Sequence, residues 1–274
     1  MSLSAVAEEC ETVAVTVGER VEGVATVAID RPDARNALNA QVRAELEEVF
    51  GAIADGRGDS EDGLRVVVLT GAEGSGAFVA GADVTELRER DALQQREASK
   101  RPRVYEVVDD CPLPVIARVN GHALGGGCEL MQACDVRIAH ADAKLGQPEI
   151  TLGIMPGGGG TQRLPRLVGE GHAMRLILLG ELIDAAEAAD IGLVEEVHGE
   201  GFDERVYDLA ASMAEHSPVA LEFAKKSVEA AARMDLESGI EYEAELFAQL
   251  FATDDKDEGI DAFLEDREPE WRGE

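Results

Sequence analysis

The chain has 274 residues, of which 45% are apolar, so it is long enough and apolar enough to bury a sizeable core. Its 56 Asp and Glu residues outnumber its 25 Lys and Arg residues, which gives a formal net charge of −31. This charge disfavours nucleic acid and anionic membranes as partners, because both repel an acidic surface.

The N-terminus carries acidic residues where a signal peptide needs basic residues followed by an apolar stretch. The longest apolar runs are also far too short to span a bilayer. We therefore expect a cytoplasmic protein. The excess of acid with little Lys predicts a halophilic protein, adapted to a salt-rich cytoplasm, because a Debye length of about 3 Å at molar salt suppresses self-repulsion. The alternative is an ordinary acidic protein.

Four cysteines and five histidines show no spacing that is typical of a metal site. Cys128 and Cys134 do not form a CxxC pair, and no two histidines lie at helical spacing. We therefore expect no metal ion and reduced, mostly buried thiols.

The chain begins with a pattern that predicts a β-hairpin. Two apolar stretches, Val13 to Val17 and Val24 to Asp30, flank a turn at residues 18–20. Asn39 can then cap a helix whose apolar residues Leu46, Val49, Phe50 and Ile53 recur at helical spacing. A polar surface loop is expected from Asp55 to Gly63.

Two continuous apolar runs, Leu64 to Gly71 and Leu113 to Gly121, predict strands that are buried on both faces. A polar stretch with helical character, from Asp91 to Asp110, lies between them, and a further strand is expected at Asp135 to Ala139. Strands that alternate with crossover helices predict an α/β domain with parallel pairing.

From Glu204 to about Glu268 the pattern is helical, with Gly239 and Gly259 expected to separate the helices. We expect residues 1–200 to form an α/β core with the active site and residues 201–274 to form a helical oligomerisation region. The helical region has more apolar surface than it can hide alone, which favours packing on another subunit. The alternative is that it folds back on its own core.

Three segments could carry chemistry: Ala77 to Val84, Val119 to Leu130 and Lys144 to Gly169. In the first, small residues after a buried strand let a ligand approach backbone N–H groups. In the second, a helix that begins at about Gly126 places free N–H groups beside Glu129. The third carries Glu149 and four successive glycines. Those glycines lack the Lys-Ser/Thr of a phosphate-binding loop, and each segment alone could be an ordinary turn.

Together the three segments predict one site. The N–H groups of Ala82 and Gly126 could hold one oxygen as an oxyanion hole. Glu129 and Glu149 could flank the same point as an acid/base pair. No Ser-His-Asp or Cys-His arrangement competes with this interpretation. The chemistry indicated is the stabilisation of an enolate formed from a carbonyl compound, with proton transfers by the two glutamates.

From about Val13 to Trp271 the sequence resembles the enoyl-CoA hydratase (crotonase) family. The matching stretches are RPDARNALN, LTGAEGSGAFVAGADV, PVIARVNGHALGGGCELMQACDVRIA, KLGQPEITLGIMPGGGGTQRL, GELIDAAEAADIGLVEEV and FATDDKDEGIDAFLEDR. The resemblance implies a crotonase-type spiral of ββα units with a C-terminal helical trimerisation region. It also implies a homo-trimer or a dimer of trimers, an acyl-CoA substrate, and no cofactor beyond the coenzyme A that is part of the substrate.

By this resemblance Glu129 and Glu149 are the catalytic residues, and Ala82 and Gly126 form the oxyanion hole. The implied reaction is hydration of a trans-2-enoyl-CoA to a 3-hydroxyacyl-CoA: Glu129 activates water, and Glu149 holds the water and protonates Cα. The residues that resemble the substrate- and CoA-binding edge are Asn36, Ala37, Leu38, Ala80, Gly81, Ala82, Asp83, Val84, Thr85, Gly125 and Gly126.

The sequence also departs from the family's pattern. Hydratases of this type often carry lysines at the positions of Gly76 and Thr85, so the basic contacts to the CoA phosphates are open. A Δ3-Δ2-enoyl-CoA isomerase or a 3-hydroxyacyl-CoA dehydratase is an alternative activity. Some members of the family bind RNA, but the net charge of −31 argues against that function here.

Overall fold

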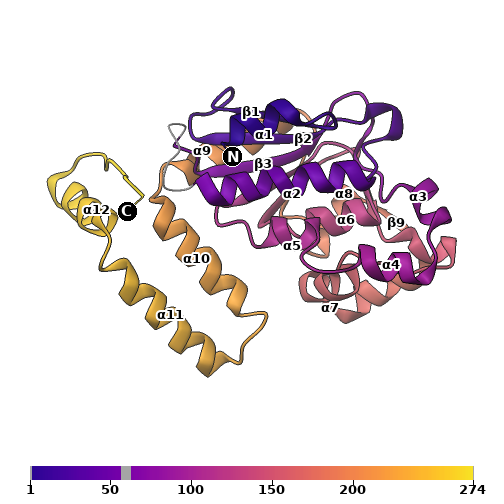
Figure 1. Cartoon of the computed structure of the whole chain (residues 1–274). Coiled ribbons are helices and arrows are strands. Elements are labelled where there is room, and N and C mark those ends of the chain that lie inside the picture. Colours follow the sequence, from indigo (N-terminus) through magenta and orange to yellow (C-terminus); the bar gives the residue numbers. More distant parts are fainter. Residues whose placement is uncertain (1, 57–62, 274) are drawn as a thin grey trace.

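The structure, a computed structural model, describes residues 2–56 and 63–273 of the chain. Most of the expected loop from Asp55 to Gly63 lies outside the described residues. In chain order (Figure 1) the elements are α1 (Leu3–Glu9), β1 (Val13–Val17), β2 (Val24–Ile29), the 3-10 helix η1 (Pro32–Ala34), α2 (Ala40–Asp55), β3 (Val66–Gly71), β4 (Ala77–Val79), α3 (Val84–Glu89), α4 (Ala92–Ala98), α5 (Val104–Asp109), β5 (Val115–Val119), β6 (His122–Leu124), α6 (Gly126–Met131), β7 (Val136–His140), β8 (Lys144–Gly146), the 3-10 helix η3 (Pro148–Leu152), α7 (Gly160–Leu179), β9 (Leu182–Asp184), α8 (Ala185–Asp190), β10 (Glu196–His198), α9 (Phe202–Ala214), α10 (Pro218–Ala230), α11 (Leu236–Leu250) and α12 (Asp254–Glu265).

The larger sheet of the described chain has the strand order β1-β2-β3-β5-β7-β10. The predicted hairpin is confirmed, because β1 and β2 pair antiparallel. The neighbouring pairs β2–β3, β3–β5, β5–β7 and β7–β10 are all parallel, as expected for the α/β class. Asn39 caps α2 by accepting a hydrogen bond from the backbone N–H of Val42 at 2.9 Å, which confirms the predicted start of that helix.

The continuous apolar runs are explained by burial on both faces of this sheet. In β3 the alternate residues Val67 and Leu69 face the main core, which α2 and α5 also line. Val66 and Val68 face the opposite side, where they pack against Phe202 and other apolar residues of α9. A strand that is covered on both faces needs apolar side chains at every position.

The smaller sheet has the order β4-β6-β8-β9. The strands β4, β6 and β8 follow β3, β5 and β7 directly in the chain, and a helical segment follows each pair. This repetition is the expected spiral of ββα units, which is therefore confirmed. Because β4, β6 and β8 are parallel, their carboxyl ends lie at one edge of the sheet. The three segments that the sequence analysis selected leave the sheet at this edge.

The expected helix from Asp91 to Asp110 is wrong as a single element, because the structure divides it into α4 and α5. Pro102 explains the break: it has no backbone N–H and disfavours the helical conformation in the residue before it. The second helix then begins with its own cap, in which the Glu106 carboxylate accepts a hydrogen bond from the Arg103 backbone N–H at 2.9 Å.

Gly239 and Gly259 do not separate helices, contrary to the sequence-based expectation. They lie inside α11 and α12, which begin instead at the capping residues Asp235 and Thr253. A single glycine disfavours a helix by only about 1 kcal/mol, so the caps decide where the helices begin. At Gly259 a Cβ would lie 2.8 Å from the ring of Trp271, so close packing requires glycine there.

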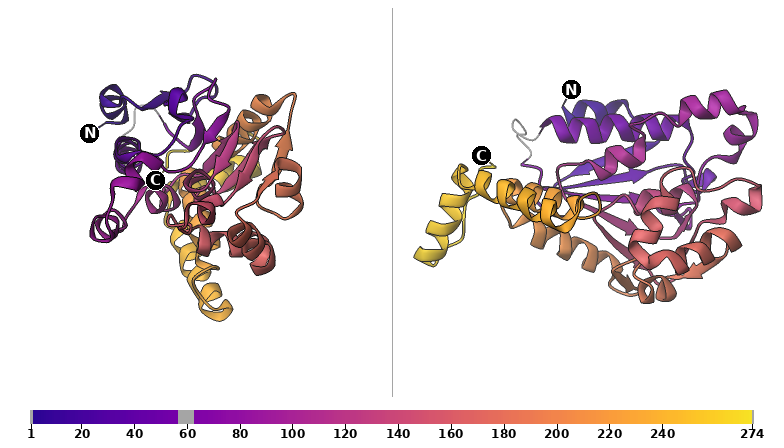
Figure 2. Two further views of the ribbon diagram at one scale, coloured as in Figure 1. Left: turned by 90° about the vertical axis from the view of Figure 1, so that its right-hand side faces the viewer. Right: turned by 90° about the horizontal axis from the view of Figure 1, so that it is seen from below.

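The C-terminal helices α10 to α12 extend away from the two sheets, with α12 farthest out (Figures 1 and 2). We call α10 to α12 the C-terminal arm. The arm leaves large apolar side chains in solvent: Phe247 is 62% exposed, Phe251 57% and Phe263 85%. These three side chains do not fold back on the core of their own chain. No helix of the described residues is both long and apolar enough to cross a membrane.

Candidate active site

The N–H groups of Ala82 and Gly126 come together as the sequence predicts. A short parallel bridge joins Leu38 to Ala82, with Leu38 N–H donating to Gly81 O at 2.9 Å and Asp83 N–H donating to Leu38 O at 3.0 Å. A Cβ placed on Gly126 would lie 3.3 Å from the Ala82 nitrogen. In the described chain neither N–H donates to another backbone or side-chain group. Both N–H groups are therefore free to donate hydrogen bonds to a ligand oxygen.

Gly126 is the first residue of α6, so the helix offers its N–H no internal acceptor. The preceding residue, Gly125, has φ +50 and ψ −120, a conformation that only glycine adopts readily. Its N–H donates to Gly146 O at 2.9 Å, which ties the start of α6 to the end of β8. The glycine run thus turns the chain sharply from β6 into the helix and leaves the Gly126 N–H exposed to a ligand.

Glu129 lies in the first turn of α6 and is 3% exposed. Its Oε1 atom accepts hydrogen bonds from the backbone N–H groups of Gly158 at 2.6 Å and Gly160 at 2.8 Å. Burial raises the pKa of Glu129, while these two N–H groups and the charges of Arg103 and Arg163 act in the opposite direction. The carboxylate is therefore held in one orientation at the site.

The glycines from 157 to 160 serve as the binding loop for the Glu129 carboxylate. A Cβ on Gly158 would lie 2.7 Å from Glu129 Oε2, and one on Gly160 would lie 3.0 Å from Oε1. These glycines lack the Lys-Ser/Thr of a phosphate-binding loop, and their sequence alone indicates no other role. Successive glycines indicate a loop with accessible N–H groups. That these N–H groups bind the Glu129 carboxylate is apparent only from the fold.

Glu149 lies in η3, directly after β8, and is half-buried. Burial, with a further contribution from the charge of Glu129, raises the pKa of Glu149 to about 7. A Cβ on Gly125 would lie 3.0 Å from Glu149 Oε1, so Glu149 stands beside the glycine turn that presents the Gly126 N–H. The structure thus brings both predicted glutamates to the two predicted N–H donors.

The expected CoA-binding stretches, residues 36–38 and 80–85, lie side by side. Asn36 is buried and braces the loop between β3 and β4, because its amide donates to Ala77 O and Ser75 Oγ at 2.9 Å each. Leu38 is also buried, whereas Val84 and Thr85 are exposed. Only some of the residues predicted to bind CoA therefore face solvent. Asn36 is not one of them, and its role is to hold the backbone of the loop between β3 and β4.

Tyr105 of α5 is a site residue that the sequence analysis did not identify. A Cβ on Gly126 would lie 3.0 Å from the Tyr105 hydroxyl, and one on Gly158 would lie 2.4 Å from its ring. Burial, and then the charge of Glu129, raises the pKa of Tyr105, so the hydroxyl stays protonated. The register of this helix depends on the break at Pro102, which the sequence pattern does not indicate, so Tyr105 could not be placed at the site from the sequence.

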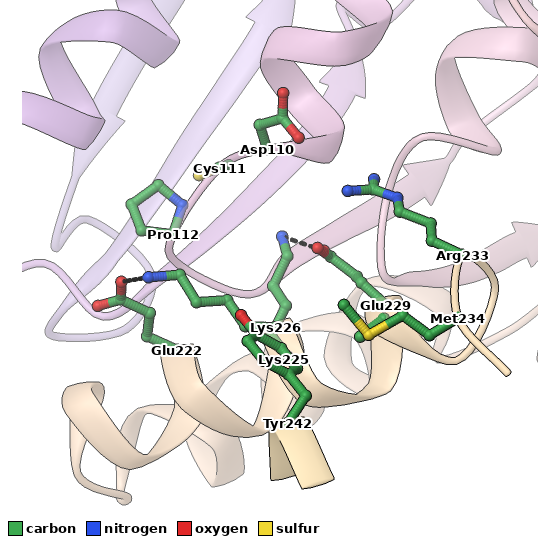
Figure 3. Close-up of a pocket in the computed structure, with 11 residues that line it drawn as sticks. Asp110, Cys111, Pro112, Glu222, Lys225, Lys226, Glu229, Arg233, Met234 and Tyr242 are labelled. Atoms are coloured by element: carbon green, nitrogen blue, oxygen red, sulfur yellow. Dashed lines mark hydrogen bonds and ion pairs between the residues drawn. The ribbon is translucent and has the colours of Figure 1, made fainter. Parts of the chain in front are cut away.

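Among the residues that the structure describes, two further hollows are well defined. One, of about 360 Å³, separates the residues 110–112 from α10, where Lys226 pairs with Glu222 at 2.5 Å and Lys225 approaches Glu229 at 3.9 Å (Figure 3). None of the predicted site residues lines it. The other, of about 520 Å³, has five arginines in its wall: Arg101, Arg103, Arg163, Arg166 and Arg233.

Two of these arginines support the loop that binds Glu129. Arg103 donates to the carbonyl oxygen of Gly157, and Arg163 donates to that of Gly158 at 3.2 Å.

Within residues 2–56 and 63–273, no group of three or more His, Cys, Asp or Glu side chains is arranged to hold a metal ion.

The fold and the site define a class of enzyme: a spiral of ββα units in which two backbone N–H groups can polarise a carbonyl and two carboxyl groups can move protons. Within that class, the chain belongs to the enoyl-CoA hydratase/isomerase family, whose model matches residues 19–274.

Relatives of known name agree with this assignment. The chain is 41% identical to the short-chain-enoyl-CoA hydratase of Clostridium acetobutylicum, over 92% of this chain and 95% of that protein. It is 42% identical to the 2,3-dehydroadipyl-CoA hydratase of Escherichia coli, over 93% and 97%. The crystal structure of an enoyl-CoA hydratase from Bacillus anthracis superposes with a TM-score of 0.88 at 39% identity, covering 96% of this chain and 100% of that one.

Proposed function

We propose that this protein is an enoyl-CoA hydratase, which adds water to a trans-2-enoyl-CoA and forms a 3-hydroxyacyl-CoA. The observation that carries the proposal is the convergence of two carboxyl groups, Glu129 and Glu149, on the N–H groups of Ala82 and Gly126. The hydratase relatives support the same activity. Loss of the enoyl-thioester absorbance of crotonyl-CoA on mixing with the protein is the simplest test.

In the proposed reaction the thioester carbonyl oxygen sits between the Ala82 and Gly126 N–H groups. Attack of water at Cβ moves negative charge onto that oxygen and produces an enolate. Donors that are fixed before the reaction stabilise this charge without reorganisation, and one such donor contributes about 10² to 10³ in rate. The substrate-binding role of residues 36–38, 80–85 and 125–126 is part of this proposal. Coenzyme A enters as part of the substrate, and we propose no further cofactor.

The environments of the two glutamates assign their roles. Burial raises the pKa of Glu129, but two backbone N–H groups donate to its carboxylate and favour the ionised form, so we assign Glu129 as the base that takes a proton from the attacking water. Glu149 has a pKa raised to about 7 and so carries the proton that is delivered to Cα. Each turnover moves one proton from water to Glu129 and one from Glu149 to Cα, and the pair returns to its starting state by exchanging a proton with solvent.

A pH profile tests this assignment. The active free enzyme holds one proton on the pair, so kcat/KM for crotonyl-CoA should follow a bell-shaped curve. We expect its alkaline limb near pH 7, because Glu149 loses its proton as the pH rises through its pKa of about 7. The acid limb reports protonation of Glu129 at lower pH. A kcat/KM that stays constant from about pH 6 to about pH 9 would exclude the proposed protonation states.

We further propose that the C-terminal arm packs on neighbouring copies to form a homo-trimer or a dimer of trimers. The exposed aromatic side chains of α11 and α12 support this assembly, because a monomer gains nothing by exposing them. The cytoplasmic location and the adaptation to salt stay predictions from the charge of the chain.

Sedimentation tests the assembly. In about 1 M KCl, where charges are screened beyond about 3 Å, we expect a multiple of three subunits, and at low salt a shift towards monomer. The double variant Phe247→Asp/Phe263→Asp should give smaller species, since it places charge on the proposed interface. Leu93→Asp changes a side chain that is 75% exposed outside the arm and should leave the assembly intact. An intact protein that sediments as a monomer at both salt concentrations is the contradictory result.

A further inference from the structure

Two buried glutamines, Gln147 and Gln132, are linked by hydrogen bonds to Glu149. Gln147, at the start of η3, is fully buried. In the orientation that satisfies its neighbours, its amide nitrogen donates to Glu149 Oε1 at 3.0 Å and to Oε2 at 3.2 Å. Its amide oxygen accepts from Gln132 Nε2 at 3.1 Å. Hydrogen bonds therefore connect Gln132 to Glu149 through Gln147.

The amide of Gln147 has two possible orientations, and the charge of Glu149 selects between them. An ionised carboxylate only accepts hydrogen bonds, so it requires the Gln147 nitrogen. A protonated Glu149 could donate to the Gln147 oxygen if the amide turned over. That turn would place the Gln147 nitrogen against Gln132 Nε2, which is also a donor. While its Nε2 faces Gln147 and Cys128, Gln132 thus opposes the orientation in which Gln147 would capture the Glu149 proton.

Packing alone does not explain why residue 132 is a glutamine. It lies at the end of α6 and is 5% exposed, and its Nε2 also donates to Cys128 Sγ at 3.2 Å. Its Oε1 atom is buried and has no hydrogen-bond partner among the residues that the structure describes. Leaving a buried acceptor unpaired is destabilising, and an apolar side chain of the same length would avoid it. Stability therefore does not explain an amide at this position.

We propose that Gln132 is a positioning residue for the hydration reaction: it fixes the amide nitrogen of Gln147 towards Glu149, so that the proton of Glu149 remains available to Cα of the substrate. This inference rests on the proposed function, and it assigns Gln132 no contact with the substrate.

The ionisable groups that face Glu149 give the direction of the expected pH effect. They are Glu129 and Cys128 from α6 and Tyr105 from α5. Burial raises the pKa of Cys128 to about 12 and also raises that of Tyr105, so both stay neutral. Burial, and then the charge of Glu129, raise the pKa of Glu149. The Gln147 amide nitrogen that donates to the Glu149 carboxylate favours the ionised form of Glu149. Without Gln132, the Gln147 amide nitrogen is no longer fixed towards Glu149, whereas burial and the charge of Glu129 remain. The pKa of Glu149 should therefore rise.

The test is Gln132→Met, which keeps the side-chain length and removes the amide. We expect kcat for crotonyl-CoA to fall about tenfold, because Glu149 donates to a turned Gln147 in part of the molecules. We expect the alkaline limb of the pH profile to move up by about one pH unit. Gln132 and Gln162 both lie in the wall of the arginine-lined hollow. The control Gln162→Met changes the exposed one of the two and should leave kcat and the alkaline limb unchanged.

A double-mutant cycle tests whether Gln132 acts through Gln147. In a Gln147→Met background, Gln132→Met should have no further effect on kcat or on the pH limb. Losses that multiply, or a Gln132→Met variant with wild-type kcat and pH profile, would overturn the inference. If wild-type protein does not hydrate crotonyl-CoA, the proposed function itself fails, so the two failures are distinguishable.

Neutron diffraction from wild-type crystals keeps the inference testable if Gln132→Met does not fold. We expect the deuterated amide nitrogen of Gln147 to face Glu149. An amide oxygen in that position would contradict the inference.

Discussion

Glutamine in place of Glu129 or of Glu149 should lower kcat for hydration by about 10² or more, the usual contribution of a positioned acid or base. The two variants should fail for different reasons. The amide oxygen of a glutamine at position 129 can still accept hydrogen bonds from the N–H groups of Gly158 and Gly160, but the amide cannot take a proton from water. An amide at position 149 holds no acidic proton for Cα. Stopped-flow measurement with crotonyl-CoA gives both values.

Controls for these variants are available in the chain. Glu170 lies on the exposed surface of α7, so Glu170→Gln removes one negative charge without reaching the site and should keep wild-type kcat. Binding of a non-reactive acyl-CoA should change little in either catalytic variant, because the oxyanion hole is intact. A variant at 129 or 149 that keeps near-wild-type kcat would show that its carboxyl group is not used.

Gly126→Pro should lower kcat by about 10² to 10³, since it removes one of the two N–H donors for the enolate oxygen. Proline suits the first turn of a helix, and Gly126 is the first residue of α6. The helix itself should therefore form, while the ring of proline occupies the space in front of the missing donor. The expected loss is in kcat and kcat/KM together, because the interaction strengthens as charge develops.

Ala92→Pro is the matched control for this variant. Ala92 is the exposed first residue of α4 and lies outside the site. Circular dichroism should show native helix content in both variants, and Ala92→Pro should keep full activity. A well-folded Gly126→Pro protein with wild-type kcat would exclude the Gly126 N–H as a donor.

The sequence predicted those parts of the fold that depend on local patterns. Continuous apolar residues marked β3 and β5 as strands covered on both faces, and Asn39 marked the start of α2. The pattern was insufficient where a local preference is weak: Gly239 was taken as a break, although one glycine is tolerated inside a helix such as α11. The break at Pro102 was missed within a stretch of otherwise helical residues.

The site was predictable to a similar extent. Glycines after buried strands, together with Glu129 and Glu149, located the donors and the carboxyl groups, because the ends of neighbouring parallel strands meet at one edge. The partners of those groups were not predictable from spacing. The N–H groups that bind Glu129 come from a loop 29 to 31 residues later, and Gln132 reaches Glu149 only through Gln147. Such contacts are set by packing between elements.

If two carboxyl groups and two N–H donors add water to an enoyl thioester, the oxygen atom of the new hydroxyl group must come from solvent. The most direct measurement is mass spectrometry of the product formed from crotonyl-CoA by the purified wild-type protein in water labelled with oxygen-18. We expect a 3-hydroxyacyl-CoA that carries one labelled oxygen from the wild-type protein, and no such product from Glu129→Gln on the same time scale. Unreacted crotonyl-CoA, or an unlabelled isomer with a displaced double bond, would contradict it.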